Sequence, residues 1–241
     1  MDRKILSFLL KGSLNNKQKI LFSDIKLNIN FNKWTSIIGQ SGSGKSTLLK
    51  IIAGMDIPTV FNNTITNSSK NHSFSLMAQN DLLLPWASVI ENVTLGQKLR
   101  REKLDINKAN NLLEDVGLIN EANNLPSTLS GGMRQRAALA RTLMENKDII
   151  LMDEPFSALD SVTRSIIQKL TWKLLKNKTV IMVTHDPLEA LLLSNNLYYI
   201  SKSKLKLIKL PSSKPFRKVN DENLLYSHNY ILRKLESSYK L

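Results

Sequence analysis

The chain has 241 residues, of which 42% are hydrophobic and 22% charged, so it is long and apolar enough to fold as one large domain or two small ones. It contains no cysteine, which excludes a disulfide framework, a thiolate metal site and a cysteine nucleophile. The net charge of +14 would suit nucleic acid or an anionic membrane surface. Lysines are scattered along the whole chain, however, so a compositional bias of the source explains the charge equally well.

Apolar runs in the sequence are short. Two of the longest, residues 149–152 and 190–193, are far shorter than the roughly 20 residues that a bilayer requires. The first ten residues are partly basic and apolar but have no small-residue cleavage site after them, and we interpret them as a strand, not a signal sequence. We therefore expect no membrane-spanning segment.

The first quarter of the chain predicts strands, a glycine loop and a helix in that order. Apolar and polar residues alternate over 25–31, which is typical of a strand with one solvated face. A short apolar strand over 35–38 runs directly into Gly39. A helix over 46–53 follows and is closed by Gly54.

The middle of the chain, about residues 81–126, is predicted to be entirely helical. A strand over 74–78 precedes it, and Ser88 with Glu91 forms a capping box at a helix start. Helices are expected to continue through residue 99 and over 107–116, and Gly117 is expected to stop the second of them.

The second half of the chain returns to an alternation of helices and strands. Its expected helices span 133–145, 161–175 and 223–235, and its expected strands span 149–152, 180–183, 197–200 and 205–208. The first two strands are continuous apolar runs, typical of buried parallel strands, and the last two form a hairpin. The order predicts antiparallel strands, then an α/β core interrupted by a helical insertion.

Residues 39–46 match the phosphate-loop pattern G-x-x-x-x-G-K-[ST] between a strand and a helix. The residues predicted to bind nucleotide here are Gly39, Gln40, Ser41, Gly42, Ser43, Gly44, Lys45, Ser46 and Thr47. The glycines let successive backbone N–H groups point at phosphate. Lys45 adds positive charge near the β and γ phosphates, and the Ser46 hydroxyl can ligate Mg²⁺. The alternative is a merely flexible Gly/Ser turn. We expect ATP and Mg²⁺ to bind.

The apolar strand over 149–152 ends in two carboxylates, Asp153 and Glu154. Asp153 is predicted to hold Mg²⁺ beside the phosphate loop, and Glu154 to act as the general base that polarises the attacking water. Many strands end in acidic turns without any catalytic role, so the pattern gains its meaning from the phosphate loop upstream.

Residues 129–136, Leu-Ser-Gly-Gly-Met-Arg-Gln-Arg, resemble the signature motif of ABC ATPases. The order of phosphate loop, signature and Asp153-Glu154 matches that family, over about residues 20–209. The resemblance implies an α/β fold with a P-loop NTPase core, an N-terminal antiparallel β-subdomain and an inserted α-helical subdomain at about 81–146. It also implies a single domain over residues 1–241, with a C-terminal helical extension at 211–241.

The resemblance assigns further site residues. Ser130, Gly131 and Gly132 would cap a helix whose N-terminus faces the γ-phosphate held by another subunit. Asp160, the last residue of the segment 157–160 that resembles the D-loop, would cross that dimer interface.

Two residues that follow strands also resemble family positions. Gln79 resembles the Q-loop glutamine that touches Mg²⁺ and water. His185 resembles the switch histidine that contacts the γ-phosphate, and with Glu154 and Lys45 it completes the predicted catalytic set.

Some positions depart from the family pattern. Lys33-Trp34 replaces the usual Gly-Glu turn, and residues 59–73 lack the glycines that shape hairpins there. The aromatic residue that stacks on adenine should lie in the N-terminal strands, and Phe8 is the candidate if residues 11–19 form a lengthened hairpin loop.

Residues 82–86, residues 88–93 and Met133 resemble the nitrate, sulfonate and taurine branch of bacterial importers, which includes carriers of thiamine pyrimidine precursors. The resemblance implies a peripheral ATPase at the cytoplasmic face of the inner membrane. Its partners would be transmembrane permease subunits, through them a solute-binding protein, and a second ATPase subunit, expected to be identical; nucleic acid is not expected. Leu83, Leu84 and Trp86 either dock the permease or pack inside the helical subdomain.

Two other protein classes remain as alternatives. A nucleic-acid-associated ABC protein would suit the basic charge, but such proteins generally carry two cassettes or a long coiled-coil insertion. A soluble P-loop kinase would share residues 39–46 but leaves residues 129–135 unexplained.

Overall fold

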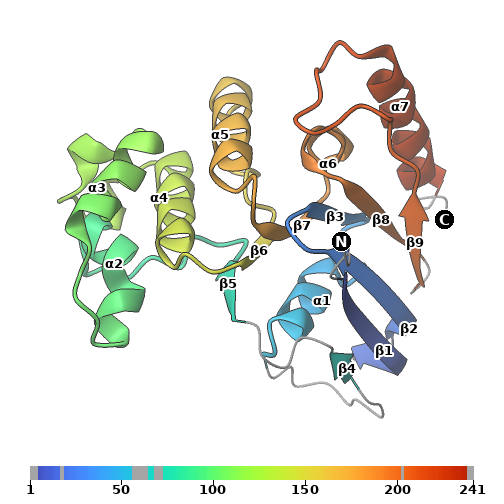
Figure 1. Cartoon of the computed structure of the whole chain (residues 1–241), viewed down its shortest axis with the longest axis horizontal. Helices are drawn as coiled ribbons and strands as arrows, with labels where there is room; N and C mark the ends of the chain where they lie inside the picture. The colour runs from blue at the N-terminus through green and yellow to red at the C-terminus, as the bar shows by residue number, and fades with distance from the viewer. Residues whose placement is uncertain (1–4, 17–18, 56–64, 68–72, 202–203, 238–241) are drawn as a thin grey trace. The chain divides into compact units, whose positions relative to one another are not determined.

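The computed structural model describes residues 5–16, 19–55, 65–67, 73–201 and 204–237 (Figure 1). The chain divides into two compact units. Unit 1 comprises residues 1–72 and 175–241, and unit 2 comprises residues 73–174. Each unit contains both strands and helices.

An antiparallel sheet in unit 1 has the strand order β2-β1-β4. Its strands are β1 (Ile5–Asn16), β2 (Lys19–Asn30) and β4 (Ile65–Asn67). Ile25, Leu27 and Ile29 are buried on β2 while the residues between them are more exposed, so the predicted alternation is confirmed. Apolar side chains on one face of this strand therefore form part of the core of the unit.

The α/β part of unit 1 is built on β3 (Trp34–Gly39), which lies between two parallel neighbours. These neighbours are β7 (Thr179–Thr184) and β8 (Asn196–Ser201), and β9 (Lys204–Ile208) pairs antiparallel with β8. Every residue of β3 and β7 is buried, as expected for apolar strands covered on both faces. The predicted hairpin and parallel core strands are confirmed.

The described residues of unit 1 form three α-helices. Both α1 (Lys45–Ile52) and α6 (Pro187–Leu193) contact β3 and β7, and Figure 1 shows them on opposite sides of these strands. The last helix, α7 (Glu222–Ser237), packs against α6. The predicted stop after α1 is confirmed, since Gly54 adopts a φ of 73° that a residue with a side chain rarely takes.

Unit 2 contains a parallel strand pair and four α-helices. The strands are β5 (Phe74–Met77) and β6 (Ile149–Asp153). The helices are α2 (Val89–Leu99), α3 (Ile106–Asp115), α4 (Gly131–Met144) and α5 (Ser161–Leu174). Helices α2, α3 and α4 pack against one another, and two 3-10 segments, η1 (Ile119–Glu121) and η2 (Pro126–Thr128), connect α3 to α4.

Local capping explains where the helices of unit 2 begin and end. The predicted capping box of α2 is confirmed: the Ser88 amide donates to Glu91 Oε2 at 2.8 Å, and the Glu91 amide donates to Ser88 Oγ at 3.4 Å. The predicted stop of α3 is also confirmed, because Gly117 has a φ of 68° and its amide donates to the Glu114 carbonyl at 2.9 Å.

The prediction that residues 81–126 are all helical is wrong for its first part. Residues 81–88 form an irregular loop, and two side chains from helices satisfy part of its backbone. Arg141 donates to the carbonyls of Asp81 and Leu82 at 2.6 and 2.7 Å. Asn92 accepts from the Leu84 amide at 2.7 Å. These long-range bonds replace the hydrogen bonds that a helix would supply.

Three further sequence predictions need correction. The loop expected at 11–19 is strand up to Asn16, while residues 17–18 lie outside the described residues. Strand β4 was not predicted, and the rest of the segment 59–73 lies outside the described residues except Ser73. Helix α6 was also missed, because it has only seven residues and an almost continuous apolar sequence without helical periodicity.

None of the helices in the described part of the chain combines the length and apolar character that crossing a membrane requires.

Candidate active site

The phosphate loop of unit 1 connects β3 to α1, and three of its glycines are required by geometry. Gly42 and Gly44 have φ values of 72° and 90°, in the left-handed region that favours glycine. A Cβ on Gly39 would lie 2.9 Å from the Ile200 carbonyl oxygen, closer than any real contact. The backbone can therefore curl tightly between strand and helix.

Lys45 is held inside this loop. It is 5% exposed, and its Nζ donates to the carbonyls of Gly39 and Gln40 at 2.8 and 2.9 Å. Gly44 has no side chain to cap the first turn of α1, so the positive end of the helix dipole lies at the loop. The ammonium and the helix start thus place positive charge where the sequence predicts phosphate.

Two polar atoms of the loop have no hydrogen-bond partner in the described part of the protein. Gln40 Nε2 and Ser43 Oγ are buried and lack a hydrogen-bond partner among the described residues. Buried polar groups without partners are costly and rare. A ligand rich in acceptor atoms, such as the polyphosphate of ATP, fits this arrangement.

His185 lies at the same sheet edge as the phosphate loop. It directly follows β7, which is parallel to β3 with Thr184 opposite Ile38. Its side chain is exposed. Unit 1 therefore brings together the phosphate loop and the predicted switch histidine.

Unit 2 brings Gln79 together with Glu154. Met77 and Met152 pair in parallel on β5 and β6, so the residues after them leave the same edge of the strand pair. Gln79 Nε2 donates to Glu154 Oε2 at 3.2 Å. Asp153, the last residue of β6, is 5% exposed. The amide thus orients the carboxylate predicted to be the general base.

The backbone turns sharply at Glu154, whose φ of 48° is uncommon for a residue with a side chain. The Ser157 hydroxyl and amide both donate to the Glu154 carbonyl, at 3.0 and 3.3 Å. These bonds hold a conformation that would otherwise be unfavourable, as is common at functional positions.

The signature segment of unit 2 starts helix α4. Ser130 is its N-cap, and Ser130 Oγ accepts from the Met133 amide at 3.2 Å. Ser130 and Gly131 are exposed, whereas a Cβ on Gly132 would lie 3.4 Å from Leu159 Cδ2. The first two residues, at the positive end of the helix dipole, are therefore accessible to another molecule, and Gly132 packs inward.

Asp160 lies at the start of α5 and stabilises its first turn. Its Oδ1 accepts from the amides of Val162 and Thr163 at 3.1 and 3.0 Å. These hydrogen bonds, chiefly those from Thr163, lower the pKa of the Asp160 carboxyl. In this structure, its observed role is that of a helix cap.

Sequence reasoning gave no role to Gln135, which lies inside the signature. Its side chain is 4% exposed, and its Nε2 donates to the Pro155 carbonyl at 3.1 Å. The bond ties α4 to the turn that follows Glu154. The available signal was its spacing, because Gln135 lies three and four residues before Ala138 and Leu139, on the apolar face of the helix, but the structure is needed to identify its partner.

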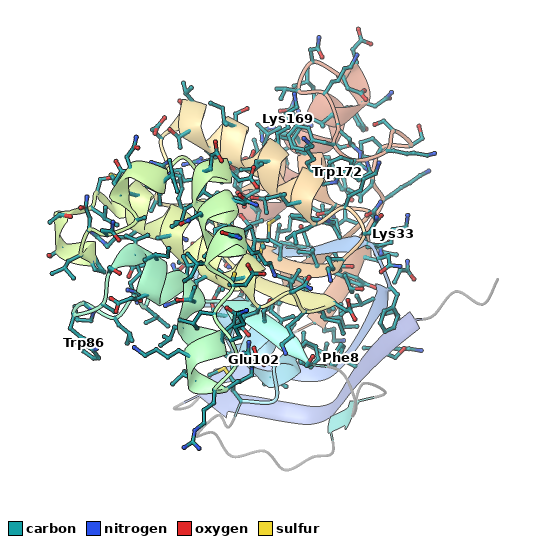
Figure 2. All side chains as sticks on the ribbon, turned by 60° about the vertical axis from the view of Figure 1, so that its left-hand side comes forward. Phe8, Lys33, Trp86, Glu102, Lys169 and Trp172 are labelled. Atoms are coloured by element: carbon teal, nitrogen blue, oxygen red, sulfur yellow. The ribbon has the colours of Figure 1, made fainter. Side chains whose placement is uncertain are left out.

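Two predictions about apolar residues change. Phe8 is 2% exposed, and Figure 2 places it against the antiparallel strands, so the prediction that its ring stacks on adenine is wrong. Leu83 is 8% exposed and packs in unit 2, which contradicts a docking role for that side chain. Trp86 is 75% exposed and extends away from the ribbon in Figure 2, and Leu84 is partly buried.

The residues predicted to ligate metal are Ser46, Gln79 and Asp153. They offer only hydroxyl, amide and carboxylate oxygens, the hard donors that Mg²⁺ prefers. The described residues contain no group of three or more His, Cys, Asp or Glu side chains that could form a metal cage. This donor set fits Mg²⁺, which usually keeps waters and shares phosphate oxygens with a nucleotide.

Comparison with known proteins identifies the family. The model of the ABC transporter family matches residues 22–157. An uncharacterized ABC transporter ATP-binding protein of Haemophilus influenzae is 38% identical over 230 residues, covering 92% of this chain and 95% of the relative. The aliphatic sulfonates import ATP-binding protein SsuB 1 of Rhodococcus jostii is 42% identical over 196 residues, covering 80% of this chain and 78% of the relative.

The fold is similar to that of solved ATP-binding cassettes. A dimeric cassette in a post-hydrolysis state, bound to ADP and Pi, superposes with a TM-score of 0.71 at 30% identity. The alignment covers 88% of this chain and 99% of that one. With a family match over more than half of its length and these relatives, the chain belongs to the ABC transporter ATP-binding proteins.

Proposed function

We propose that the chain is the ATP-hydrolysing subunit of a bacterial ABC importer that takes up a small solute through a separate permease. The solute class is sulfonate-, taurine- or nitrate-like, or a pyrimidine precursor. The observation that carries this proposal is the 42% identity to an aliphatic sulfonates import ATP-binding protein over 80% of the chain. The chain itself is an ABC-type ATPase whose hydrolysis is coupled to transport.

We further propose that residues 1–241 act as a single ABC ATPase domain. Its helical subdomain spans about residues 81–146, and residues 211–241 form a C-terminal helical extension. The packing of α2, α3 and α4 on one another supports the first assignment, and α7 supports the second.

In the proposed reaction, a water oxygen attacks the γ-phosphorus of ATP and the bond to the β-phosphate bridging oxygen breaks, which yields ADP and phosphate. Glu154 accepts the proton of this water, and its hydrogen bond with Gln79 orients its carboxylate. Lys45 and the start of α1 stabilise charge on the phosphates. His185 contacts the γ-phosphate.

Ser46, Gln79 and Asp153 would hold Mg²⁺, which supplies positive charge to the phosphate oxygens. The oxygen-only character of these three residues supports the assignment.

A second copy of the chain completes the proposed site. Ser130 and Gly131 are exposed at the positive end of α4, and a γ-phosphate bound to a partner chain would receive stabilisation from that helix start. When two chains form this dimer, each nucleotide lies between the phosphate loop of one chain and the signature of the other. The dimeric cassette similar to this chain supports the arrangement.

The loop of residues 81–88 is proposed to receive the permease at the cytoplasmic face of the inner membrane, with a solute-binding protein on the far side. Trp86 is the exposed anchor of this surface. Asp81 forms an ion pair with Arg134 at 3.1 Å, so the loop is connected to the signature helix within unit 2. Movement of the loop by the permease would therefore reach α4.

The proposed function is tested with the complex that copurifies with the tagged chain from its native cells. After reconstitution in vesicles with the solute-binding protein, ATP hydrolysis is measured with alkanesulfonates, taurine, nitrate and hydroxymethylpyrimidine. We expect at least one of these solutes to stimulate hydrolysis severalfold. An active complex that none of these solutes stimulates would reject the proposed solute classes, and a chain that copurifies with no membrane protein would reject the importer.

A further inference from the structure

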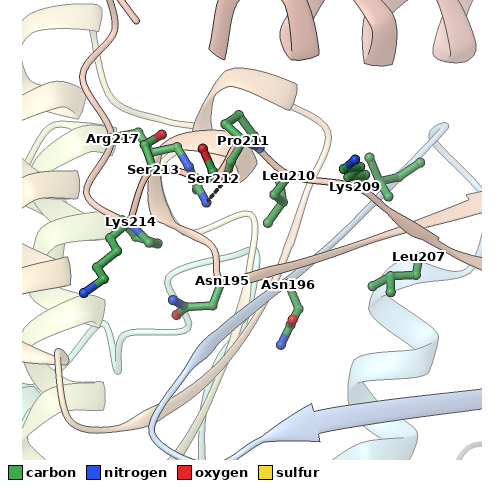
Figure 3. Close-up of a pocket in the computed structure, with 12 residues that line it drawn as sticks. Asn195, Asn196, Leu207, Lys209, Leu210, Pro211, Ser212, Ser213, Lys214 and Arg217 are labelled. Carbon is green, nitrogen blue, oxygen red and sulfur yellow. Dashed lines mark hydrogen bonds between the residues drawn. The ribbon is translucent and has the colours of Figure 1, made fainter. Parts of the chain in front are cut away.

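A second polar pocket lies in unit 1, at the opposite end of β3 from the phosphate loop (Figure 3). It has a volume of about 390 Å³, in the range of small-molecule sites. Asn196 lines it and pairs with Thr35 at the start of β3, whereas Gly39 opens the phosphate loop at the other end. Thr35 and Gly39 are four residue steps apart along the strand, about 13 Å at 3.3 Å per residue.

The pocket is lined by a buried guanidinium without an ion-pair partner in the part of the chain that the structure describes. Arg217 is 4% exposed, and it donates to the carbonyl oxygens of Leu191, Ser194 and Pro211 at 2.5, 2.8 and 3.4 Å. Among the described residues no carboxylate forms an ion pair with it, and its Nε has no hydrogen-bond partner. A buried charge without a counter-charge is strongly unfavourable.

Burial lowers the pKa of Arg217, and the more distant charge of Asp221 opposes this effect only in part. The guanidinium nevertheless remains protonated, because arginine is not deprotonated in proteins. The protein therefore keeps a positive charge at the wall of this pocket that Asp221 compensates only in part.

The other polar groups of the pocket favour an anion as well. Lys209 and Lys214 also line it, and no Asp or Glu does. Ser213 Oγ is buried and lacks a hydrogen-bond partner among the described residues, so a second donor is unused beside Arg217. Figure 3 shows Ser213 and Arg217 side by side at one end of the pocket.

The remaining wall is apolar. Leu207, Leu210 and Pro211 line the pocket, and it is larger than an inorganic anion needs. A ligand with a charged head group and a short aliphatic body would use both surfaces.

We propose that this pocket binds a small organic oxyanion, a sulfonate or carboxylate with a short aliphatic body, whose head group contacts Arg217, Ser213 and Lys214. The ligand neutralises the buried guanidinium and accepts hydrogen bonds from the two unused donors. Arg–oxyanion pairs are short, charge-assisted and often bidentate, which suits this role.

The pocket is connected to β3 by direct hydrogen bonds. Asn195, which lines it, accepts from the Trp34 amide at 3.0 Å and donates its own amide to the Trp34 carbonyl at 2.8 Å. The Ser194 carbonyl accepts from Arg217, and the Ser194 hydroxyl bonds to that of Ser36. An occupied pocket therefore stabilises the start of the strand that ends in the phosphate loop.

The test is calorimetric titration of the full chain with butanesulfonate and with sulfate at constant ionic strength. The phosphate loop is first saturated with a non-hydrolysable ATP analogue and Mg²⁺, so that it does not contribute anion binding. We expect saturable binding of one butanesulfonate per chain, at least about threefold tighter than sulfate because the aliphatic body contacts the apolar wall. Equal affinities would overturn the organic character of the ligand, and no saturable binding would overturn the site.

Variants separate this pocket from the general basic charge. Ser213→Ala removes a hydroxyl for which the described residues provide no hydrogen-bond partner, so folding should be unchanged while butanesulfonate affinity falls at least about fivefold. Lys218→Ala is the matched control, since Lys218 is exposed nearby but does not line the pocket. The affinity of this variant for butanesulfonate should change less than about twofold. Arg217→Gln should abolish binding, with the folded state checked by circular dichroism. Equal binding by the Ser213 and Lys218 variants would contradict the proposal.

Discussion

Glu154 offers the simplest test of the proposed chemistry. Its carboxylate is held by Gln79 at 3.2 Å at the end of β6. Glu154→Gln keeps the shape and a hydrogen-bond acceptor but removes the basic group. We expect ATP binding within about twofold of the original chain and hydrolysis at least about a hundredfold slower, measured as phosphate release.

A matched carboxylate controls for the loss of charge alone. Glu114→Gln changes an exposed residue on α3 in the same unit and should leave hydrolysis unchanged. Near-normal turnover by the Glu154 variant would reject the general-base assignment.

Ser130 serves as a helix cap in the structure and as a phosphate contact in the proposal, and these roles can be separated. Ser130→Ala removes the bond from the Met133 amide and should lower the free energy of unfolding by about 1 kcal/mol. Ser88→Ala removes the cap of α2 in the same unit and should cost a similar amount. We expect only the Ser130 variant to lose hydrolysis, and equal activity losses in the two variants would assign the effect to stability.

Asp160 gives a pH prediction. Hydrogen bonds from Thr163 lower its folded-state pKa, so its ionised form contributes stability above pH about 3.9, the ordinary value in an unfolded chain. That contribution is lost as the pH falls through the lowered folded-state pKa. Carboxyl NMR titration should report a pKa below the ordinary value, and Thr163→Ala should raise it part of the way back. An unshifted value in the original chain would contradict the cap geometry.

At the scale of elements, the loop of residues 81–88 depends on Asn92. Its buried side chain accepts from the Leu84 amide at 2.7 Å and donates to the Leu84 and Ala87 carbonyls at 3.2 and 3.0 Å. Asn92→Ala removes these bonds, although the Leu84 carbonyl still accepts from the Ala87 amide, and should lower the free energy of unfolding by about 2–3 kcal/mol in urea denaturation. Asn111→Ala, on the exposed face of α3, should cost less than about 0.5 kcal/mol.

The same loop should carry the permease contact through Trp86. Because this side chain is 75% exposed, Trp86→Ala should leave stability and ATP binding intact while reducing copurification of the permease severalfold. An unchanged complex would refute the docking role.

Elements with local signals could be predicted from the sequence. The capping box of Ser88 and Glu91, the stop at Gly117 and the strand, loop and helix around Lys45 each depend on neighbours within a few residues. The loop of residues 81–88 could not be predicted, because its conformation depends on Arg141, about 60 residues away in sequence. The burial of Phe8 likewise follows from pairing with β2 opposite Leu27, which local patterns do not encode.

The features of the candidate site likewise divide into local motifs, which the sequence predicts, and long-range contacts, which it does not. The phosphate loop and the Asp153-Glu154 pair are local motifs, and the sequence identified their residues. The bonds from Gln79 to Glu154 and from Gln135 to Pro155 join segments that are 75 and 20 residues apart, so they required the fold. The role of Arg217 could not be predicted from the sequence, because its burial and its lack of an ion pair among the described residues are properties of the packed chain.

In the complete molecule, the proposed hydrolysis depends on two chains sharing each nucleotide. A symmetric pair contains two such sites, each combining the phosphate loop of one chain with the signature of the other. Gly131→Asp places a negative charge at the start of α4, where it repels phosphate but is compatible with the helix dipole. The side chain also fits, because the nearest neighbour of a Cβ added at Gly131 lies 3.8 Å away. Lys45→Ala disables the phosphate loop instead.

The most direct measurement mixes these two variants, each inactive alone, and follows phosphate release. A mixed pair contains one site with both parts intact, so random pairing should restore roughly a quarter of the original activity. Three controls must hold: both variants fold, the Gly131 variant binds ATP, and mixed pairs form. If they hold and no activity returns, the shared site is contradicted.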